Sequence, residues 1–215
     1  MIIWCASYPK SGNTWVRAII TSLLYSEDGI FNFDMLKNIS LFPKRFYFKE
    51  FTDDYSDLKK ISHHWIAAQE KINSDDKLRI FKTHNGNYNF YGKDFTNKKN
   101  TIGVIYVVRD PRNIITSIAN HYQLDLQQSA DFLFDEKRYL FNKKDPNDFS
   151  EENIFTLLGS WKTNYNSWKA TSNSLIIRYE DLLLNTKSEI NKLSIFMQKF
   201  TKFNINDEKI QNILK

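Results

Sequence analysis

The sequence is poor in cysteine and contains no long apolar run. Cys5 is the single cysteine among the 215 residues, so no disulfide can form within the chain and nothing indicates a disulfide-stabilised secreted fold. No run of about 18 apolar residues is present, which excludes a transmembrane helix. The apolar start, MIIWCA, is too short for the core of a signal peptide, and we therefore expect a cytoplasmic protein without a membrane span.

A large excess of one charge is also missing. Thirty basic and 25 acidic side chains leave a net charge of +5, which favours an anionic ligand but is too small to demand nucleic acid. Hydrophobic residues make up 41% and charged residues 26%, as in a soluble globular protein. No repeat, low-complexity tract or linker interrupts the chain, and its length fits one domain with a substantial core.

Short apolar runs alternate with helix-like segments. Residues 2–6 form a continuous apolar run, as expected of a strand buried on both faces of a parallel sheet, and residues 14–25 show helical spacing. Further buried strands are predicted over residues 78–83, 102–108 and 175–178. A helix whose face is formed by Leu157, Leu158, Trp161, Tyr165 and Trp168 precedes the last of these strands. This alternation predicts a single α/β domain with a mainly parallel sheet flanked by helices.

Two further segments have a less regular pattern. Residues 31–70 are expected to be helical and irregular, and they are placed to form a cap over the site. Within them, residues 41–51 mix aromatic and basic side chains, which suits either an acceptor pocket or a core-facing helix. Residues 207–215 are predicted to form a helix with Asn206 as its N-cap.

Ligands of open α/β sheets bind at the carboxyl ends of the strands. Residues 7–14, 82–86, 109–117 and 179–181 follow the four predicted strands, so we expect these segments to converge on one crevice.

The first of these segments, with the residue after it, reads SYPKSGNTW (residues 7–15). Gly12 allows close backbone approach to a ligand, and successive N–H groups open onto a helix N-terminus, which is phosphate-binding chemistry. Lys10 adds a cation and Thr14 a hydroxyl. The segment is not a Walker A loop, because its lysine precedes Ser11 and Gly12 instead of ending the motif. A plain strand-to-helix turn with a solvated lysine is the alternative.

The other segments carry one histidine and one arginine–serine pair. A lone histidine is more often structural, but His84 ends a predicted buried strand, where a site is expected. Arg109 also follows a strand, and Ser117 lies eight residues beyond it; a guanidinium fork and a hydroxyl suit a phosphate monoester. Tyr179 begins a Tyr-Glu-Asp segment, a weak signal by itself.

Taken in order, these segments resemble the sulfotransferases that use 3′-phosphoadenylyl sulfate (PAPS). SYPKSGNTW agrees with the family pattern Thr-Tyr-Pro-Lys-Ser-Gly-Thr-Thr-Trp at seven of nine positions and departs from it at Ser7 and Asn13. Lys-Thr-His at residues 82–84, Arg109 with Ser117, and Tyr-Glu-Asp at residues 179–181 match three later motifs. Asn85 and Gly86 stand where the family commonly has Leu-Pro. The resemblance extends from residue 2 to about residue 200.

This resemblance implies a P-loop-nucleotide-hydrolase-like fold and transfer of a sulfuryl group from PAPS to a hydroxyl or amine of a small acceptor, with release of adenosine 3′,5′-bisphosphate (PAP). His84 is then the general base, Lys10 reaches the bridging oxygen of the donor, and Lys82 stabilises the sulfuryl oxygens. The residues implied to hold the nucleotide are Lys10, Ser11, Gly12, Asn13, Thr14, Trp15, Arg109, Ser117 and Tyr179. No metal and no nucleic acid is expected.

Two alternative functions stay open, and one motif of the family is missing from residues 1–215. An ATP-dependent small-molecule kinase is an alternative, although its Gly-Lys-Ser/Thr loop is absent. The other alternative is a non-enzymatic protein that binds a nucleotide or RNA through basic and aromatic side chains. The family also has an Arg-Lys-Gly loop near its C-terminus that covers the nucleotide, and residues 1–215 are expected to be a sulfotransferase domain that lacks this loop or closes its site differently.

Overall fold

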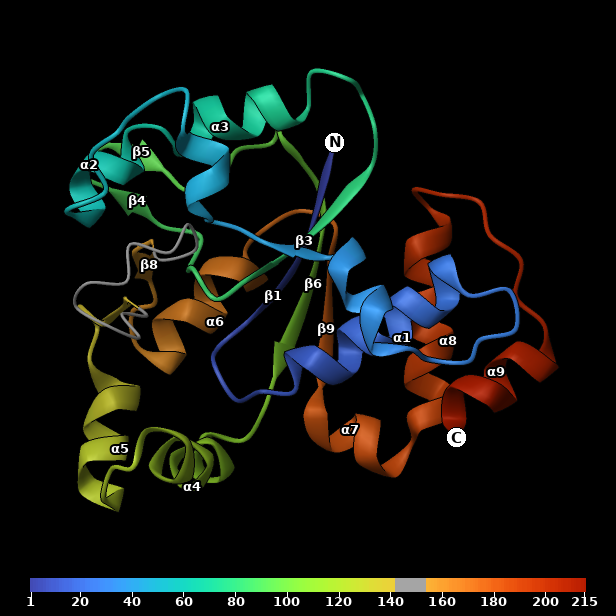
Figure 1. Ribbon diagram of the computed structural model, residues 1–215. Coiled ribbons are helices and arrows are strands. Elements are labelled where there is room, and N and C mark those ends of the chain that lie inside the picture. Colours follow the sequence, from blue (N-terminus) through green and yellow to red (C-terminus); the bar gives the residue numbers. More distant parts are fainter. Residues whose placement is uncertain (142–153) are drawn as a thin grey trace.

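The computed structural model describes residues 1–141 and 154–215, and a five-stranded sheet lies at its centre (Figure 1). The strand order is β2-β3-β1-β6-β9, and every neighbouring pair is parallel. These strands are β1 (Ile2–Ser7), β2 (Ser40–Leu41), β3 (Arg79–Thr83), β6 (Thr101–Val108) and β9 (Ser174–Arg178). The predicted α/β class and parallel sheet are therefore confirmed.

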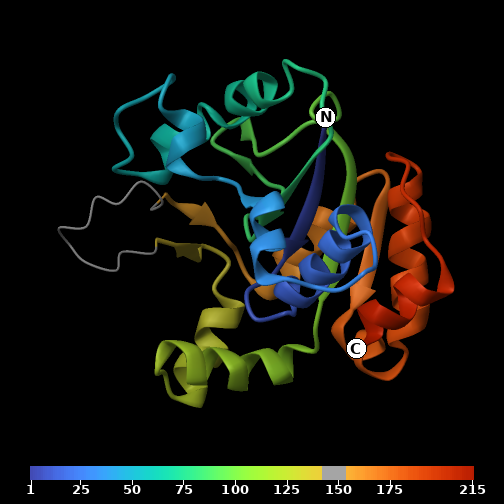
Figure 2. The same ribbon diagram turned by 45° about the vertical axis from the view of Figure 1, so that its right-hand side comes forward.

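Helices cover both faces of this sheet, as the turned view of Figure 2 shows. One face is covered by α1 (Asn13–Tyr25), α8 (Thr186–Gln198) and α9 (Asp207–Leu214), with the 3₁₀ helix η1 (Phe33–Asn38) beside α1. The other is covered by η2 (Arg45–Phe48), α2 (Leu58–Ser62), α3 (Trp65–Ile72) and α6 (Trp161–Lys169). At the carboxyl ends of the strands lie α4 (Pro111–Tyr122), α5 (Leu126–Phe134) and α7 (Tyr179–Leu184). Two antiparallel two-stranded sheets, β4 (Asn89–Phe90) with β5 (Lys93–Asp94) and β7 (Tyr139–Leu140) with β8 (Thr156–Leu157), complete the described elements.

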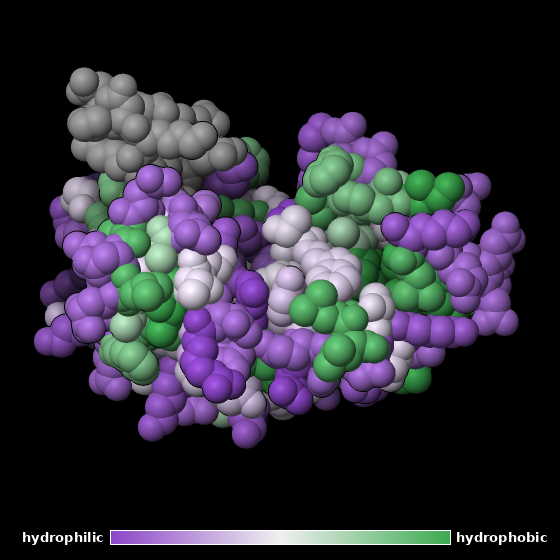
Figure 3. All heavy atoms as spheres, turned by 90° about the horizontal axis from the view of Figure 1, so that it is seen from below, coloured by the Kyte–Doolittle hydropathy of each residue, from purple (hydrophilic) through white to green (hydrophobic). Residues whose placement is uncertain are grey.

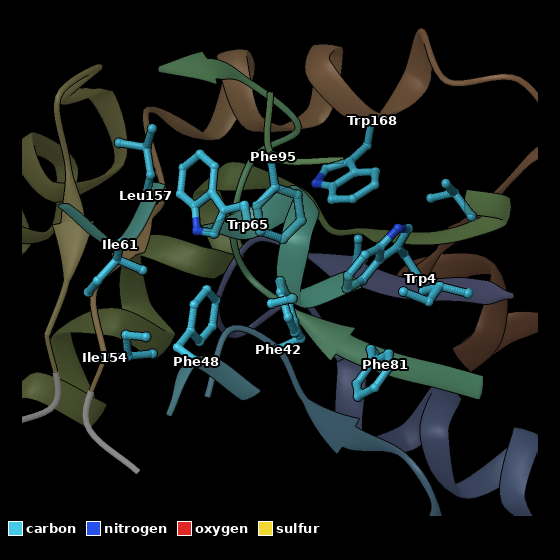
Figure 4. Close-up of a cluster of buried hydrophobic side chains, with 14 of the residues drawn as sticks. Trp4, Phe42, Phe48, Ile61, Trp65, Phe81, Phe95, Ile154, Leu157 and Trp168 are labelled. Carbon is cyan, nitrogen blue, oxygen red and sulfur yellow. The ribbon is translucent and has the colours of Figure 1, made fainter. Parts of the chain in front are cut away.

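The two faces of the sheet have different cores. Aromatic rings fill the α3 and α6 side, where Trp4 lies 5.3 to 6.1 Å from the rings of Phe42, Phe81, Phe95 and Trp168 (Figure 4). The α1 and α8 side is mostly aliphatic, with Ile3 and Cys5 of β1 in contact with that layer. Because successive residues of β1 point to opposite faces, both cores meet on one strand, which explains its continuous apolar run.

One predicted helix begins later than its sequence pattern indicated. Leu157 belongs to β8 and Leu158 to the following loop, whereas α6 begins at Trp161. The side chain of Ser160 accepts a hydrogen bond from the Thr163 N–H and caps the helix, and Gly159 precedes it with φ of 65°. The two leucines have helical spacing and are buried, but one lies in a strand and the other in a loop.

The segment over residues 31–70 is helical and irregular, as expected. Within residues 41–51, Phe42 and Phe48 are fully buried in the aromatic core, which favours the core reading of this stretch. The two-residue strand β2 was not predicted; its Leu41 pairs with Lys82 of β3. Asn206 caps α9 through a bond from the Lys209 N–H, which confirms the last predicted helix. No helix in the described part of the chain is long and apolar enough to cross a membrane.

Candidate active site

The four predicted strand-end segments are joined by direct contacts. Figure 3 views the molecule from the side of these segments, below the sheet of Figure 1, and shows hydrophilic and hydrophobic residues interspersed on it. His84 contacts Ser7, and Arg109 contacts Lys10. Tyr179, which follows β9, contacts Arg109 and joins the fourth segment to them. The predicted convergence is therefore confirmed for these residues.

The loop between β1 and α1 has the geometry of an anion cradle. Gly12 has φ of 94° and Lys10 φ of 65°, so the backbone turns sharply twice before α1 begins. The Asn13 amide donates to the Cys5 carbonyl at 3.0 Å, which ties the helix start to the sheet. The Oγ of Ser11 is buried and has no hydrogen-bond partner among the described residues, as expected of a group that binds a ligand. Thr14 is exposed in the first turn of α1.

His84 is held in one tautomer by the end of β1. Its Nδ1 lies 2.7 Å from the Ser7 carbonyl oxygen and 3.3 Å from the Ser7 Oγ. A carbonyl oxygen only accepts, so Nδ1 carries the hydrogen and Nε2 carries the lone pair. Burial and the nearby Lys82 ammonium lower the pKa of His84 to about 3, against the opposing effect of the bond to Ser7. The imidazole is therefore neutral at pH 7, with Nε2 able to accept a proton.

Two cations lie near His84 on the α1 face of the sheet. Lys82 is adjacent to Cys5 across the β1–β3 pairing, and burial together with the Arg17 guanidinium lowers its pKa. Arg17 donates from Nη2 to the carbonyls of Leu36 and Ile39 at 3.0 and 3.1 Å. No carboxylate is among the described groups that shift the pKa of Lys82 or His84. The pair therefore forms a positive region that an anionic group would neutralise.

Arg17 was missed at the sequence level. It follows Asn13 by four residues on α1, so both lie on one helix face, and that spacing is the signal that would have found it.

Arg109 and Tyr179 join the remaining segments to the loop. Arg109 Nη1 donates to the Lys10 carbonyl at 3.1 Å, and its guanidinium carbon lies 4.3 Å from the Tyr179 ring centroid. The Tyr179 ring also meets Trp15 at 5.9 Å with an interplanar angle of 76°. A Cβ built on Gly12 would lie 2.5 Å from Tyr179 Cδ2, so a side chain there would collide with the ring. Arg109 Nε is buried without a partner among the described residues.

Ser117 is the predicted residue that the structure leaves apart. It lies within α4, partly exposed, and no hydrogen bond joins it to the other predicted site residues in the described part of the chain. Its role stays a prediction.

The residues after His84 form a polar network that the sequence did not indicate. Asn85 is buried; its Oδ1 accepts from the Leu157 N–H at 2.7 Å and its carbonyl accepts from Trp168 Nε1 at 2.8 Å. Asn164 donates to the His84 carbonyl at 3.0 Å and accepts from the Tyr106 hydroxyl at 2.8 Å. The turn after β3 is thereby attached to β8 and α6.

A cleft of about 840 Å³ lies beside this network. Its lining includes the aromatic residues Tyr88, Phe90, Tyr91, Tyr139 and Phe155, with the charged residues Asp57, Lys59, Glu136 and Lys137 among the others. The Tyr88 hydroxyl donates to the Leu158 carbonyl at 3.1 Å, and the Gly86 N–H donates to the Leu157 carbonyl at 2.8 Å. The cleft therefore shares its wall with the turn that follows His84. Among residues 1–141 and 154–215, no cluster of three His, Cys, Asp or Glu side chains could hold a metal ion.

Comparisons with known proteins agree with one another. The family model described as "Sulfotransferase domain" matches residues 2–215. Luciferin sulfotransferase of Photinus pyralis is 27% identical over 98% of this chain and 53% of that protein, and 3-beta-hydroxysteroid sulfotransferase of Cavia porcellus is 24% identical over 97% and 61%. The chain thus spans between half and two thirds of the length of these relatives.

Solved structures are similar in fold. A mouse sulfotransferase complexed with PAP superimposes with a TM-score of 0.59 at 20% identity, over 99% of this chain and 62% of that one. Retinol dehydratase in complex with androsterone and PAP gives 0.55 at 14% identity, over 99% and 62%. These structures have the P-loop-like sulfotransferase fold, and the predicted fold is confirmed.

Gly12 is expected to be intolerant of any side chain. Gly12→Ala places a methyl group against the Tyr179 ring and also strains a positive φ. Gly92→Ala is the matched control, because Gly92 has φ of 77° but nothing within 4 Å of its Cβ position. Urea unfolding should show a loss of about 1 to 2 kcal/mol for Gly92→Ala and about 1 to 3 kcal/mol more for Gly12→Ala. Equal losses would contradict the proposed contact with Tyr179.

His84 is expected to stay neutral through the physiological range. The pKa of about 3 in the folded protein is below the ordinary value of 6.5, so the folded state binds fewer protons than the unfolded state between these values, and its stability decreases as pH falls. In ¹H–¹³C NMR spectra, the Hε1 signal assigned by its loss in His84→Gln should not titrate between pH 8 and pH 5. A titration centred near the ordinary value would show that the imidazole is solvated.

Proposed function

Because the chain belongs to the sulfotransferase family, we propose that it transfers a sulfuryl group from PAPS to a hydroxyl or amine of a small organic acceptor. The observation that carries this proposal is His84, a neutral histidine at a strand end next to a cationic lysine and an anion cradle, with no hydrogen-bond partner for its Nε2 among the residues that the structure describes. The relatives support it, since their names state sulfotransfer to luciferin and to a hydroxysteroid.

The donor is proposed to lie along the carboxyl ends of β1, β6 and β9. The N–H groups at the start of α1 and the unpartnered Ser11 Oγ suit the 5′-phosphosulfate, with Lys10 beside them. The unpartnered Arg109 Nε suits the 3′-phosphate, because a guanidinium binds phosphate through several N–H groups at once. Trp15 and Tyr179 are apolar surfaces for the adenine ring. Two solved structures of similar fold contain PAP, which supports a nucleotide of this kind as the ligand.

The chemical step then needs a base and two stabilising cations. His84 Nε2 takes the proton of the acceptor while the acceptor oxygen or nitrogen forms its bond to sulfur. The bond between sulfur and the bridging oxygen breaks, and PAP leaves with the electron pair. Lys10 stabilises the charge on the leaving oxygen and Lys82 that on the sulfuryl oxygens. A general base typically contributes about 10²- to 10⁴-fold to the rate.

The acceptor is proposed to enter through the cleft of about 840 Å³ beside the turn after His84. Its aromatic lining favours an acceptor with a sizeable apolar surface, and the charged residues of its wall allow polar substituents. The cytoplasmic location expected from the sequence stays a prediction.

Nucleotide preference tests the donor directly. We expect PAP to stabilise the protein in a thermal-shift titration, by about 2.7 kcal/mol at 100 times its dissociation constant, which corresponds to roughly 5–10 °C. The shift with 5′-AMP should be smaller, and ATP with Mg²⁺ should give no larger one. Arg109→Ala should weaken binding of PAP far more than binding of 5′-AMP. A shift with ATP and Mg²⁺ alone would favour the kinase alternative.

Turnover tests the base separately from binding. His84→Gln keeps a polar side chain but has no group that accepts the acceptor proton in the same way, so sulfuryl transfer should fall by at least about 100-fold. The thermal shift with PAP should be retained, because His84 contacts β1 and not the proposed nucleotide residues. Normal turnover in this variant would remove the assigned base, and a lost PAP shift would show that His84 shapes the donor site instead.

A further inference from the structure

The connection between β6 and α4 consists of Arg109 and Asp110 alone. Pro111 begins α4 and has no N–H of its own. The Asp110 carboxylate faces α4, where it accepts bonds from the Arg112 N–H at 2.9 Å and the Arg112 Nε at 3.0 Å. The Asp110 N–H instead crosses to α7 and donates to Glu180 Oε1 at 2.8 Å. The backbone directly after Arg109 is thus attached to α7 through the Glu180 side chain.

Tyr179, the residue before Glu180, contacts Arg109, which is the other residue of this connection. The Tyr179 ring stacks on the Arg109 guanidinium, with the guanidinium carbon 4.3 Å from its centroid. Two consecutive residues of α7 therefore hold two consecutive residues of the connection, one through a ring and one through a hydrogen bond. The Arg109 Nη1 is occupied by the Lys10 carbonyl, whereas its buried Nε is without a partner among the described residues.

From this arrangement we infer that Glu180 is a positioning residue for the nucleotide: it orients the connection after β6 so that Arg109 presents its free N–H to the 3′-phosphate. This inference rests on the proposed function. A guanidinium binds phosphate through a rigid planar fork, so its contribution depends on angle as well as distance. Without an acceptor for its N–H, Asp110 is expected to turn toward water and to carry Arg109 with it.

The charge of Glu180 makes this role distinguishable from a general electrostatic one. A carboxylate close to a phosphate site repels the phosphate, so its charge alone opposes binding. A glutamine at this position retains an oxygen that accepts the Asp110 N–H but removes the negative charge. The positioning role therefore predicts opposite effects for Glu180→Ala and Glu180→Gln, whereas a purely electrostatic role predicts that both variants bind PAP more tightly.

The experiment is calorimetric titration of the full chain with PAP and with 5′-AMP. Glu180→Ala should weaken PAP binding by about tenfold and leave 5′-AMP within about twofold, because the loss concerns the 3′-phosphate. Glu180→Gln should bind PAP at least as tightly as the wild type. Glu208→Ala is the matched control, since Glu208 also stands in the first turn of a helix, α9, and is exposed on a helix that packs on α1 and α8.

The outcomes separate this inference from the function on which it rests. If the wild type does not prefer PAP to 5′-AMP, the proposed donor has failed, and the role of Glu180 fails with it. If the wild type has that preference and Glu180→Ala keeps it, only the positioning role is overturned. Equal weakening of both nucleotides in Glu180→Ala indicates a general structural role and also overturns it. Faster amide exchange of Asp110 in Glu180→Ala, restored in Glu180→Gln, supports it without any nucleotide.

Discussion

The packing of one ring, that of Tyr179, makes a single site out of segments that are far apart in the sequence. The ring fills the space where a Gly12 side chain would lie, stacks on the Arg109 guanidinium and meets Trp15. The ring can therefore occupy this place only because residue 12 has no side chain. Parallel strands bring these residues to one edge, where the ring contacts add to the direct hydrogen bond between Arg109 and the Lys10 carbonyl.

The charges near His84 are unbalanced, because the described residues supply cations there and no carboxylate. Lys82 and Arg17 are close enough to shift pKa values, and no carboxylate compensates them there. Two cations near each other and partly buried destabilise the protein without a ligand. Together with burial, which has the largest effect, they lower the pKa of His84 and hold the imidazole neutral, as a proton acceptor requires. An anionic donor would relieve the repulsion and gain affinity from it, so the same arrangement lowers stability and favours binding.

The sequence predicted the strands that are buried on both faces and the residues directly after them, because continuous apolar runs and strand ends are local patterns. It placed the start of α6 too early, since Leu157 and Leu158 have helical spacing although their burial comes from a strand and a loop. The strand β2 is two residues long, too short for any periodicity. Glu180 escaped prediction because its role depends on a tertiary neighbour, the backbone N–H of Asp110. Arg17 has a local signal, its spacing from Asn13 on α1, but its neighbour Lys82 comes from a distant strand.

The donor and acceptor sides of the site follow different physical rules. On the donor side, phosphate geometry restricts the loop to residues that allow positive φ and present N–H groups, so the motif is readable in the sequence. On the acceptor side, Asn85 and Asn164 attach the turn after His84 to β8 and α6 through hydrogen bonds. This polar framework fixes the turn that follows His84, the proposed base, beside the aromatic side chains that line the cleft. In the proposed function those side chains contact the acceptor, whereas the strand-end motifs contact the donor, so the sequence indicates the proposed reaction more clearly than the acceptor.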